Sequence, residues 1–208
     1  MPDDIHAYLS HHAPRTWQRM VSGRRLNLVN PSPLDVEISD IALGLSRNSR
    51  WNGQTEGPYA WSVAQHSLLV VDIMRRFKPT PSNTILMAGL LHDASEYVTH
   101  DLVTPLKTVV GDVFREVEDR LMCAIHLRFS LPARLQKKDK ALIKKADLVA
   151  AATEATQLAG FTEKEVRTIL SIGEKPADWV TLTPYPAEEA ISQFLQAFDS
   201  LQTDKSRS

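Results

Sequence analysis

The chain of 208 residues contains a single cysteine, Cys123, so an internal disulfide is excluded. A protein without disulfides suits a reducing compartment. No segment approaches the roughly 20 apolar residues that a membrane span needs. The N-terminus, MPDDIHAYLSHHAPR, also lacks the basic start and apolar run of a secretory signal. We therefore expect a soluble, cytoplasmic protein with no membrane partner.

The chain has no excess of charge of one sign. Its 24 Lys and Arg residues nearly balance its 25 Asp and Glu residues, and the formal net charge is -1. This balance does not favour a nucleic-acid polymer as a partner. With 43% hydrophobic residues and no repeat or linker, residues 1–208 are expected to form one domain with a sizeable core.

The hydrophobic period along most of the chain is helical, and we predict an all-α irregular helical bundle with its core at about 38–160. The exception is RRLNLVNPSPLDVEI, residues 24–38, where an Asn-Pro-Ser-Pro turn between two aliphatic runs predicts a small N-terminal β-ribbon. Asn48 to Tyr59 is expected to be a loop. Helical patterns follow Ser39-Asp40, begin at Ala60, run from Ser82 or Asn83 through ILMAGLLHDASEY, and cover about 109–129, 140–158 and 187–201.

His92 and Asp93 form the most informative pair in the sequence. They end the apolar run Ile85–Leu91, where a charged carboxylate needs compensation. A divalent cation would compensate Asp93 directly and would accept an imidazole nitrogen from His92. The alternative is an ordinary core pair, or one that hydrogen-bonds at a helix C-terminus.

Two further polar residues interrupt core-like helical segments. His66 lies within WSVAQHSLLVV and Asp147 within ALIKKADLVAAAT. If these helices pack against the one that ends at His92 and Asp93, two nitrogens and two oxygens converge on one divalent ion. Mn, Co, Fe, Ni, Zn and Mg all stay open as its identity. Alternatively, His66 is a hydrogen-bonded core residue and Asp147 pairs with a neighbouring lysine.

The order of His66, His92-Asp93 and Asp147 resembles the H…HD…D signature of the HD superfamily. LHDASEYVTHDLVTPLK and SRWNGQT…WSVAQHSLLV are similar to the YfbR-like branch of deoxynucleotidases, which we group with the phage dATP triphosphohydrolases. The resemblance covers about residues 38–155. It implies a metal-dependent phosphohydrolase with the HD-domain fold.

The resemblance also implies roles for five further residues. Glu96, three positions beyond Asp93, would be the general acid and base, and Asp101 would orient water or a leaving oxygen. Arg50 would bind a phosphate, Trp51 would stack on a nucleobase, and Lys107 would contact further phosphates. Simpler alternatives are a turn aspartate at Asp101, a surface charge beside a packed aromatic at Arg50 and Trp51, and a solvated Lys107.

The substrate implied by the resemblance is a small nucleotide. We favour deoxynucleoside 5′-monophosphates with release of phosphate, because few basic residues near the motif are available to hold three phosphates. The alternatives are a deoxynucleoside triphosphate triphosphohydrolase and a noncatalytic nucleotide-binding HD protein. A homodimer formed through an apolar helix face is possible.

Overall fold

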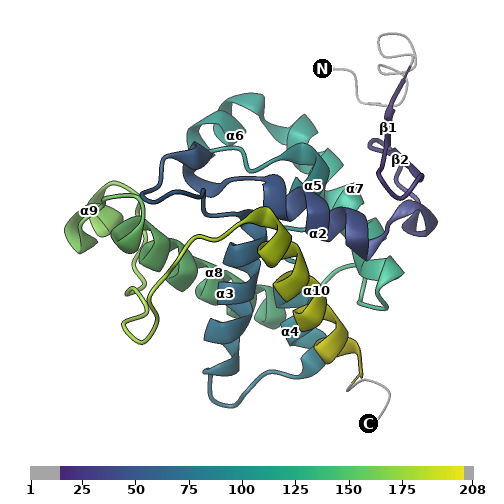
Figure 1. Cartoon of the computed structure of the whole chain (residues 1–208). Coiled ribbons are helices and arrows are strands. Elements are labelled where there is room, and N and C mark those ends of the chain that lie inside the picture. The colour runs from purple at the N-terminus through teal and green to yellow at the C-terminus, as the bar shows by residue number, and fades with distance from the viewer. Residues whose placement is uncertain (1–14, 204–208) are drawn as a thin grey trace.

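The structure is a computed structural model that describes residues 15–203 (Figure 1). The N-terminal segment MPDDIHAYLSHHAPR, which was predicted to lack a secretory signal, falls almost entirely outside the described residues. The described part is mostly helical with one two-stranded sheet, which confirms the predicted fold class. No described helix is both long and apolar enough to cross a bilayer. The principal helices are α2 (Ile38–Arg47), α3 (Val63–Arg75), α4 (Asn83–Leu90), α7 (Asp112–Arg128), α8 (Lys137–Gln157) and α10 (Ala187–Thr203).

The β-ribbon exists, but it lies earlier than predicted. Strand β1 (Trp17–Arg19) pairs antiparallel with β2 (Arg25–Asn27), and Gly23 at φ 92° forms the turn between them. The predicted turn at Asn-Pro-Ser-Pro instead leads into a short 3-10 helix, η1 (Pro33–Asp35), capped by the Ser32 hydroxyl. Prolines lack the N–H that a strand ladder uses, whereas Pro33 suits the first position of a helix.

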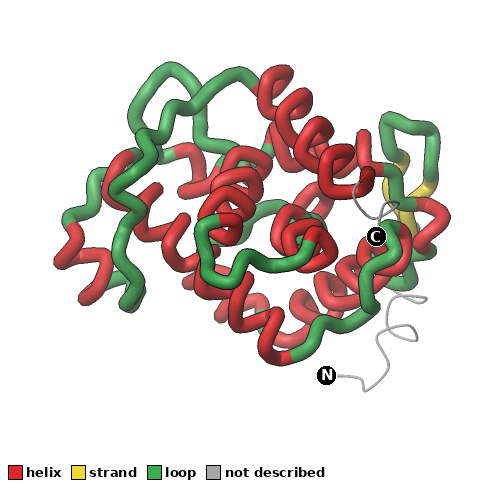
Figure 2. Tube along the Cα trace, turned by 90° about the horizontal axis from the view of Figure 1, so that it is seen from below, coloured by secondary structure: helices red, strands yellow, loops and turns green. Residues whose placement is uncertain are grey.

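Helix α3 is the centre of the bundle. It packs against α8, α4 and α10, and ten of its thirteen residues are buried. Helix α10 crosses α2, α3 and α4 and buries Phe194 and Phe198 against them (Figure 1). Seen from below, helices make up most of the trace and the sheet lies at one margin (Figure 2). Since α3, α4 and α8 are neighbours, the elements that carry His66, His92 and Asp147 meet as the sequence suggested.

The helix predicted through ILMAGLLHDASEY is broken in the middle. Helix α4 ends at Leu90, residues 91–95 form turns, and α5 covers Glu96–Thr99. Within the break the backbone uses i to i−3 hydrogen bonds, including Glu96 N–H to the Asp93 carbonyl at 3.0 Å. The His92 ring takes the Gly89 carbonyl that a continued helix would have bonded to the Asp93 N–H. His92 and Asp93 therefore do not lie on a regular helix.

The helix predicted over 109–129 is also divided. Gly111, at φ 79°, separates α6 (Thr104–Val110) from α7. This left-handed conformation suits glycine and ends α6. Helix α6 therefore begins within the segment DLVTPLK. A further short helix that the sequence analysis did not predict, α9 (Glu163–Thr168), begins with a capping box made by Thr162 and Glu165.

Gly44 lets α2 approach α5 closely, and this contact fixes the segment that carries Glu96. A Cβ at Gly44 would lie 2.7 Å from both the Cβ and the carbonyl oxygen of Tyr97. We expect Gly44→Ala to lower the free energy of unfolding by about 1–3 kcal/mol through overpacking. Urea denaturation measures this change. Gly173→Ala, where the added Cβ has no neighbour within 4 Å, is the control; an equal loss in both variants would contradict the role of this contact.

Candidate metal and phosphate site

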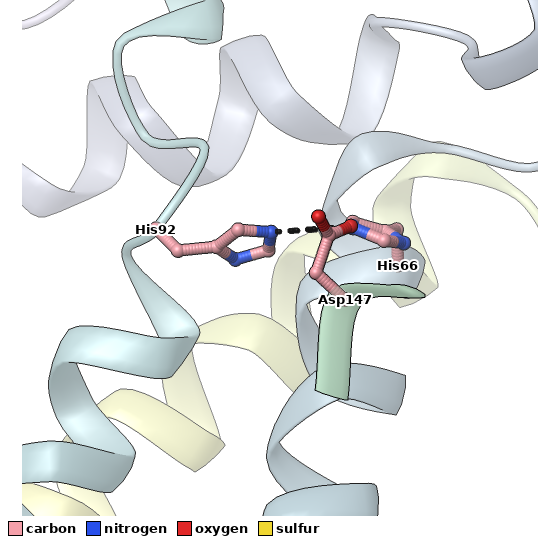
Figure 3. A group of neighbouring side chains, drawn as sticks. All are labelled: His66, His92 and Asp147. Carbon is pink, nitrogen blue, oxygen red and sulfur yellow. Dashed lines mark hydrogen bonds and ion pairs between the residues drawn. The ribbon is translucent and has the colours of Figure 1, made fainter. Parts of the chain in front are cut away.

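His66 projects from α3 into the centre of the molecule and is fully buried. Its Nε2 lies 3.3 Å from the Nε2 of His92 and 3.3 Å from the Asp147 Oδ1 on α8. Figure 3 shows the His92 ring pointing toward the Asp147 carboxylate, which lies beside His66. One ligand atom from each of these three residues lies within 4.8 Å of the others.

Asp93, the fourth predicted ligand, lies beside the two histidines but is not one of the three residues whose ligand atoms gather within 4.8 Å. Its Oδ2 lies 3.2 Å from the His92 Nε2 and 3.6 Å from the His66 Nε2. Two ligand atoms that each stand about 2.1 Å from one ion are about 3.0–4.2 Å apart in common coordination geometries. The separations between the histidine nitrogens and the carboxylate oxygens, from 3.2 Å for His92 and Asp93 to 4.0 Å for His92 and Asp147, fall within that interval.

The hydrogen bonds of the two imidazoles fix which nitrogen each presents to the centre. The His66 Nδ1 donates to Glu154 Oε1 at 2.6 Å, and the His92 Nδ1 donates to the Gly89 carbonyl at 2.8 Å. Both acceptors lack a proton, so each Nδ1 carries the hydrogen. The Nε2 atoms therefore face each other with lone pairs or with an added proton. This arrangement of nitrogens and carboxylate oxygens attracts positive charge and fits a divalent cation.

The charges around the centre favour ionised carboxylates and a positively charged His66. Burial and Arg50 lower the pKa of His66, but Glu154 and Asp147 outweigh them and raise it to about 10. Burial raises the pKa values of Asp93 and Asp147, but the histidines bring both well below the usual range. The carboxylates are therefore ionised, as metal ligands must be.

Asp147 is also held from outside the centre. Lys144, one turn earlier on α8, donates to its Oδ2 at 2.7 Å. The predicted alternative of a lysine pair is thus present alongside the metal-like geometry, and Oδ1 still faces the histidines. The two oxygens of Asp147 have separate partners.

Glu154 is the residue that the sequence analysis missed. It is fully buried on α8 and binds the His66 Nδ1, the Arg50 Nε at 2.9 Å and the Trp51 Nε1 at 3.0 Å. Burial raises its pKa, but Arg50 and His66 outweigh this and hold it at about 2. Its position was a usable signal, because a glutamate seven residues after Asp147 lies on the same helix face, among small apolar residues.

Arg50 and Trp51 belong to a short 3-10 turn, η2 (Arg50–Gly53). Backbone bonds from Arg50 N–H to Trp61 and from Val63 N–H to Asn48 anchor this turn to the start of α3. Trp51 has φ 55°, which is unfavourable for a bulky residue. Its indole bond to Glu154 and its packing 5.9 Å from the Phe161 ring hold it there. The interpretation of this pair as a surface charge beside an aromatic does not account for the Arg50 side chain, which is only 12% exposed.

The acidic residues predicted for catalysis lie beside the centre. Arg50 Nη1 is 3.6 Å from Asp101 and 3.9 Å from Asp93. Burial, with Asp93 and Asp101 nearby, raises the pKa of Glu96 to about 9. Lys107 opposes this shift and donates to the Glu96 Oε1 at 3.1 Å, while the buried Oε2 has no partner among the described residues.

Two cavities adjoin the centre. The smaller, of about 350 Å³, is lined by all five residues predicted for catalysis and substrate binding, by Asp93 and Asp147, and by apolar side chains such as Leu148, Leu170 and Ile172. The larger, of about 720 Å³, lies on the side of α7 and includes His92 and Asp147 in its wall. The five residues predicted for catalysis and substrate binding therefore share the first cavity. No sequence pattern indicated the second cavity.

These features define a helical protein with an HD-type centre. The family model of YfbR-like 5′-deoxynucleotidases matches residues 43–167, and the chain belongs to this family of hydrolases. An uncharacterized protein of Rhodobacter capsulatus is 54% identical over 151 residues, which are 73% of this chain and 77% of that protein. The uncharacterized protein YfdR of Escherichia coli is 27% identical over 167 residues, 80% of this chain and 85% of its own length.

Glu154→Gln tests whether the buried charge positions the metal ligands. The amide keeps the size of the side chain but weakens its bonds to His66 and Arg50, so we expect the affinity for Mn²⁺ to fall about 10- to 100-fold. Competition with a chelating dye measures this affinity. Glu188→Gln, which changes an exposed residue on α10, is the control. Unchanged affinity in a folded Glu154→Gln protein would exclude the positioning role.

Proposed function

We propose that the chain is a metal-dependent phosphohydrolase that releases phosphate from deoxynucleoside 5′-monophosphates. One observation carries this proposal: the cavity beside the metal-like centre also contains Arg50 and Lys107, two cations suited to a phosphate. Family membership supports the hydrolase chemistry and the nucleotide class.

His66, His92, Asp93 and Asp147 would hold the cation. When bound, a divalent cation activates water for attack on phosphorus and neutralises phosphate oxygens. The four side chains leave room for water and phosphate oxygens beside a cation. Only one oxygen of Asp147 faces the histidines, and the smaller cavity opens beside them. The hydrogen bonds at Nδ1 hold both imidazole rings, so binding needs little reorientation of the rings, and His66 releases its Nε2 proton on binding.

Arg50 and Lys107 would orient the phosphate. The Arg50 Nε is committed to Glu154, and its Nη1 lies within 4 Å of Asp93 and Asp101, so the guanidinium is held at the cavity wall. A cation fixed in advance stabilises charge that develops on the phosphate oxygens. Lys107 adds a second positive charge on the side of α6.

Glu96 would manage the proton. Its Oε1 accepts from Lys107, whereas Oε2 has no partner within the described part of the chain and is the oxygen from which a proton can pass to the leaving 5′ oxygen. Asp101, across the cavity beside Arg50, would orient the attacking water or the leaving oxygen. Trp51 forms part of the wall of the same cavity.

The first test concerns the substrate. Protein loaded with Mn²⁺ or Co²⁺ is expected to release inorganic phosphate from deoxynucleoside 5′-monophosphates, because the cavity of about 350 Å³ is at the small end for ligand sites. A phosphate assay over mono- and triphosphates of all four bases measures this. Inorganic triphosphate as the product would favour the triphosphohydrolase, and tight binding without turnover under any metal would favour a noncatalytic protein.

The second test separates metal binding from proton transfer. Glu96→Gln is expected to lower kcat about 10²- to 10⁴-fold while Mn²⁺ affinity stays close to that of the unchanged protein. Asp93→Asn removes a ligand oxygen and is expected to abolish turnover and weaken Mn²⁺ binding together. Turnover and chelator competition are measured on both variants. Equal loss of metal affinity in the two variants would argue against an acid–base role for Glu96.

A further inference from the structure

The larger cavity lies between α7, the segment 131–136 and the first half of α8. It has an apolar floor formed by Ala88, Met122, Leu135 and Ile143. Charged side chains, among them Arg134 and Lys140, line it as well. A cavity of about 720 Å³ that combines apolar with charged side chains has the size of a small-molecule site.

This cavity is continuous with the candidate centre. Lys144 and Asp147 line both cavities, and His92 lines the larger one. Asp147 therefore stands where the two meet, on one face of α8, with Leu148 and Ala151 on one side and Ile143 and Lys140 on the other. A ligand whose phosphate lies at the centre can extend along α8 in either direction.

The volumes of the two cavities favour one of these directions for the nucleoside. The smaller cavity would contain the phosphate and the attacking water beside Arg50 and Lys107, and its volume is close to the roughly 300 Å³ lower limit of ligand sites. The larger cavity has about twice that volume next to the same ligands. A sugar and base fit more readily there than beside the phosphate.

His126 supplies an independent observation. It is 6% exposed, lines the larger cavity and donates from Nδ1 to the Pro132 carbonyl at 2.9 Å. Its Nε2 is then an acceptor, and it is buried with no partner among the described residues. A buried acceptor without a donor destabilises the folded protein. Nucleosides carry hydroxyl and amine donors, so a small adjustment of this ring would satisfy Nε2 in a complex.

We infer that the larger cavity binds the nucleoside part of the substrate, with the sugar next to Asp147 and the base over the floor between α7 and α8. The inference rests on the proposed function and extends it. Under this inference Trp51 lines the smaller cavity, which would bind the phosphate, and does not stack on the base as the sequence suggested. It also makes His126 a hydrogen-bond acceptor for the nucleoside.

Cys123 provides a direct test, because it lines this cavity and is the only thiol in the chain. Its alkylation by N-ethylmaleimide can be followed by the mass of the intact Mn²⁺-loaded protein. Deoxynucleosides at about ten times their Kd are expected to slow the reaction about tenfold. Inorganic phosphate, which binds on the other side of Asp147, is expected to leave the rate unchanged. Protection by phosphate equal to that by every deoxynucleoside would overturn the inference.

A pair of variants gives a second measurement. Ala133→Trp fills part of the larger cavity, and Ala141→Trp places the same side chain on an exposed position of α8 outside both cavities. We expect Ala133→Trp to raise the KM for deoxynucleoside monophosphates about tenfold, and the Kd of deoxynucleosides by the same factor. Inhibition by inorganic phosphate should stay unchanged. Ala141→Trp should behave like the unchanged protein. Equal nucleoside affinity in both variants would place the nucleoside elsewhere.

Protection of Cys123 and the Kd of a deoxynucleoside need binding but no turnover. If nucleosides protect Cys123 and no phosphate is released, the binding inference stands and the proposed reaction fails. If phosphate is released but nucleosides neither protect Cys123 nor respond to Ala133→Trp, the reaction stands and the cavity assignment fails.

Discussion

The carboxylate of Glu154 lies in the middle of the bundle, where an isolated charge would be too costly to keep. Three donors from two distant segments compensate it: the imidazole of His66, the guanidinium of Arg50 and the indole of Trp51. Each donor is fixed in return. The His66 ring is oriented with Nε2 toward Asp147, and the turn that carries Arg50 and Trp51 is held against α8 despite the left-handed backbone at Trp51. The metal-like centre and the smaller cavity are therefore mechanically joined through one side chain.

A second constraint is the break between α4 and α5. Adjacent residues on a regular helix point about 100° apart, so they rarely serve one ion. The tight turns after Leu90 bring the His92 Nε2 and the Asp93 Oδ2 within 3.2 Å, and the His92 ring replaces a backbone donor at Gly89. The same turns start α5 at Glu96, and the Asn48 side chain donates to the Glu96 carbonyl, which ties that residue to the Arg50 segment. Local satisfaction of backbone groups thus gives the site its geometry.

The sequence predicted those parts of the site that are local anomalies. His66 and Asp147 interrupt apolar helical patterns, and His92-Asp93 ends one, so each is visible without knowledge of its neighbours. Glu154 is a similar interruption, but its importance depends on Arg50, more than a hundred residues away. The ribbon was misplaced because aliphatic residues around Asn-Pro-Ser-Pro resemble strands, whereas the actual pairing uses Trp17–Arg19, which has little apolar character. The larger cavity is lined by residues of α7, of α8 and of the segment between them, and no single segment encodes it.

Charge balance links the parts of the site. Without a cation, the acidic residues Asp93, Asp101, Asp147 and Glu154 are paired with Arg50, Lys144 and His66. Burial and Arg50 lower the pKa of His66, but Glu154 and Asp147 outweigh them. Burial, with Asp93 and Asp101 nearby, raises the pKa of Glu96. A phosphate dianion would meet repulsion from the same carboxylates. In the proposed reaction, a divalent cation would place positive charge among these carboxylates, so that Arg50 and Lys107 would act as net attraction for the phosphate. On that proposal, metal binding increases the affinity of the site for phosphate.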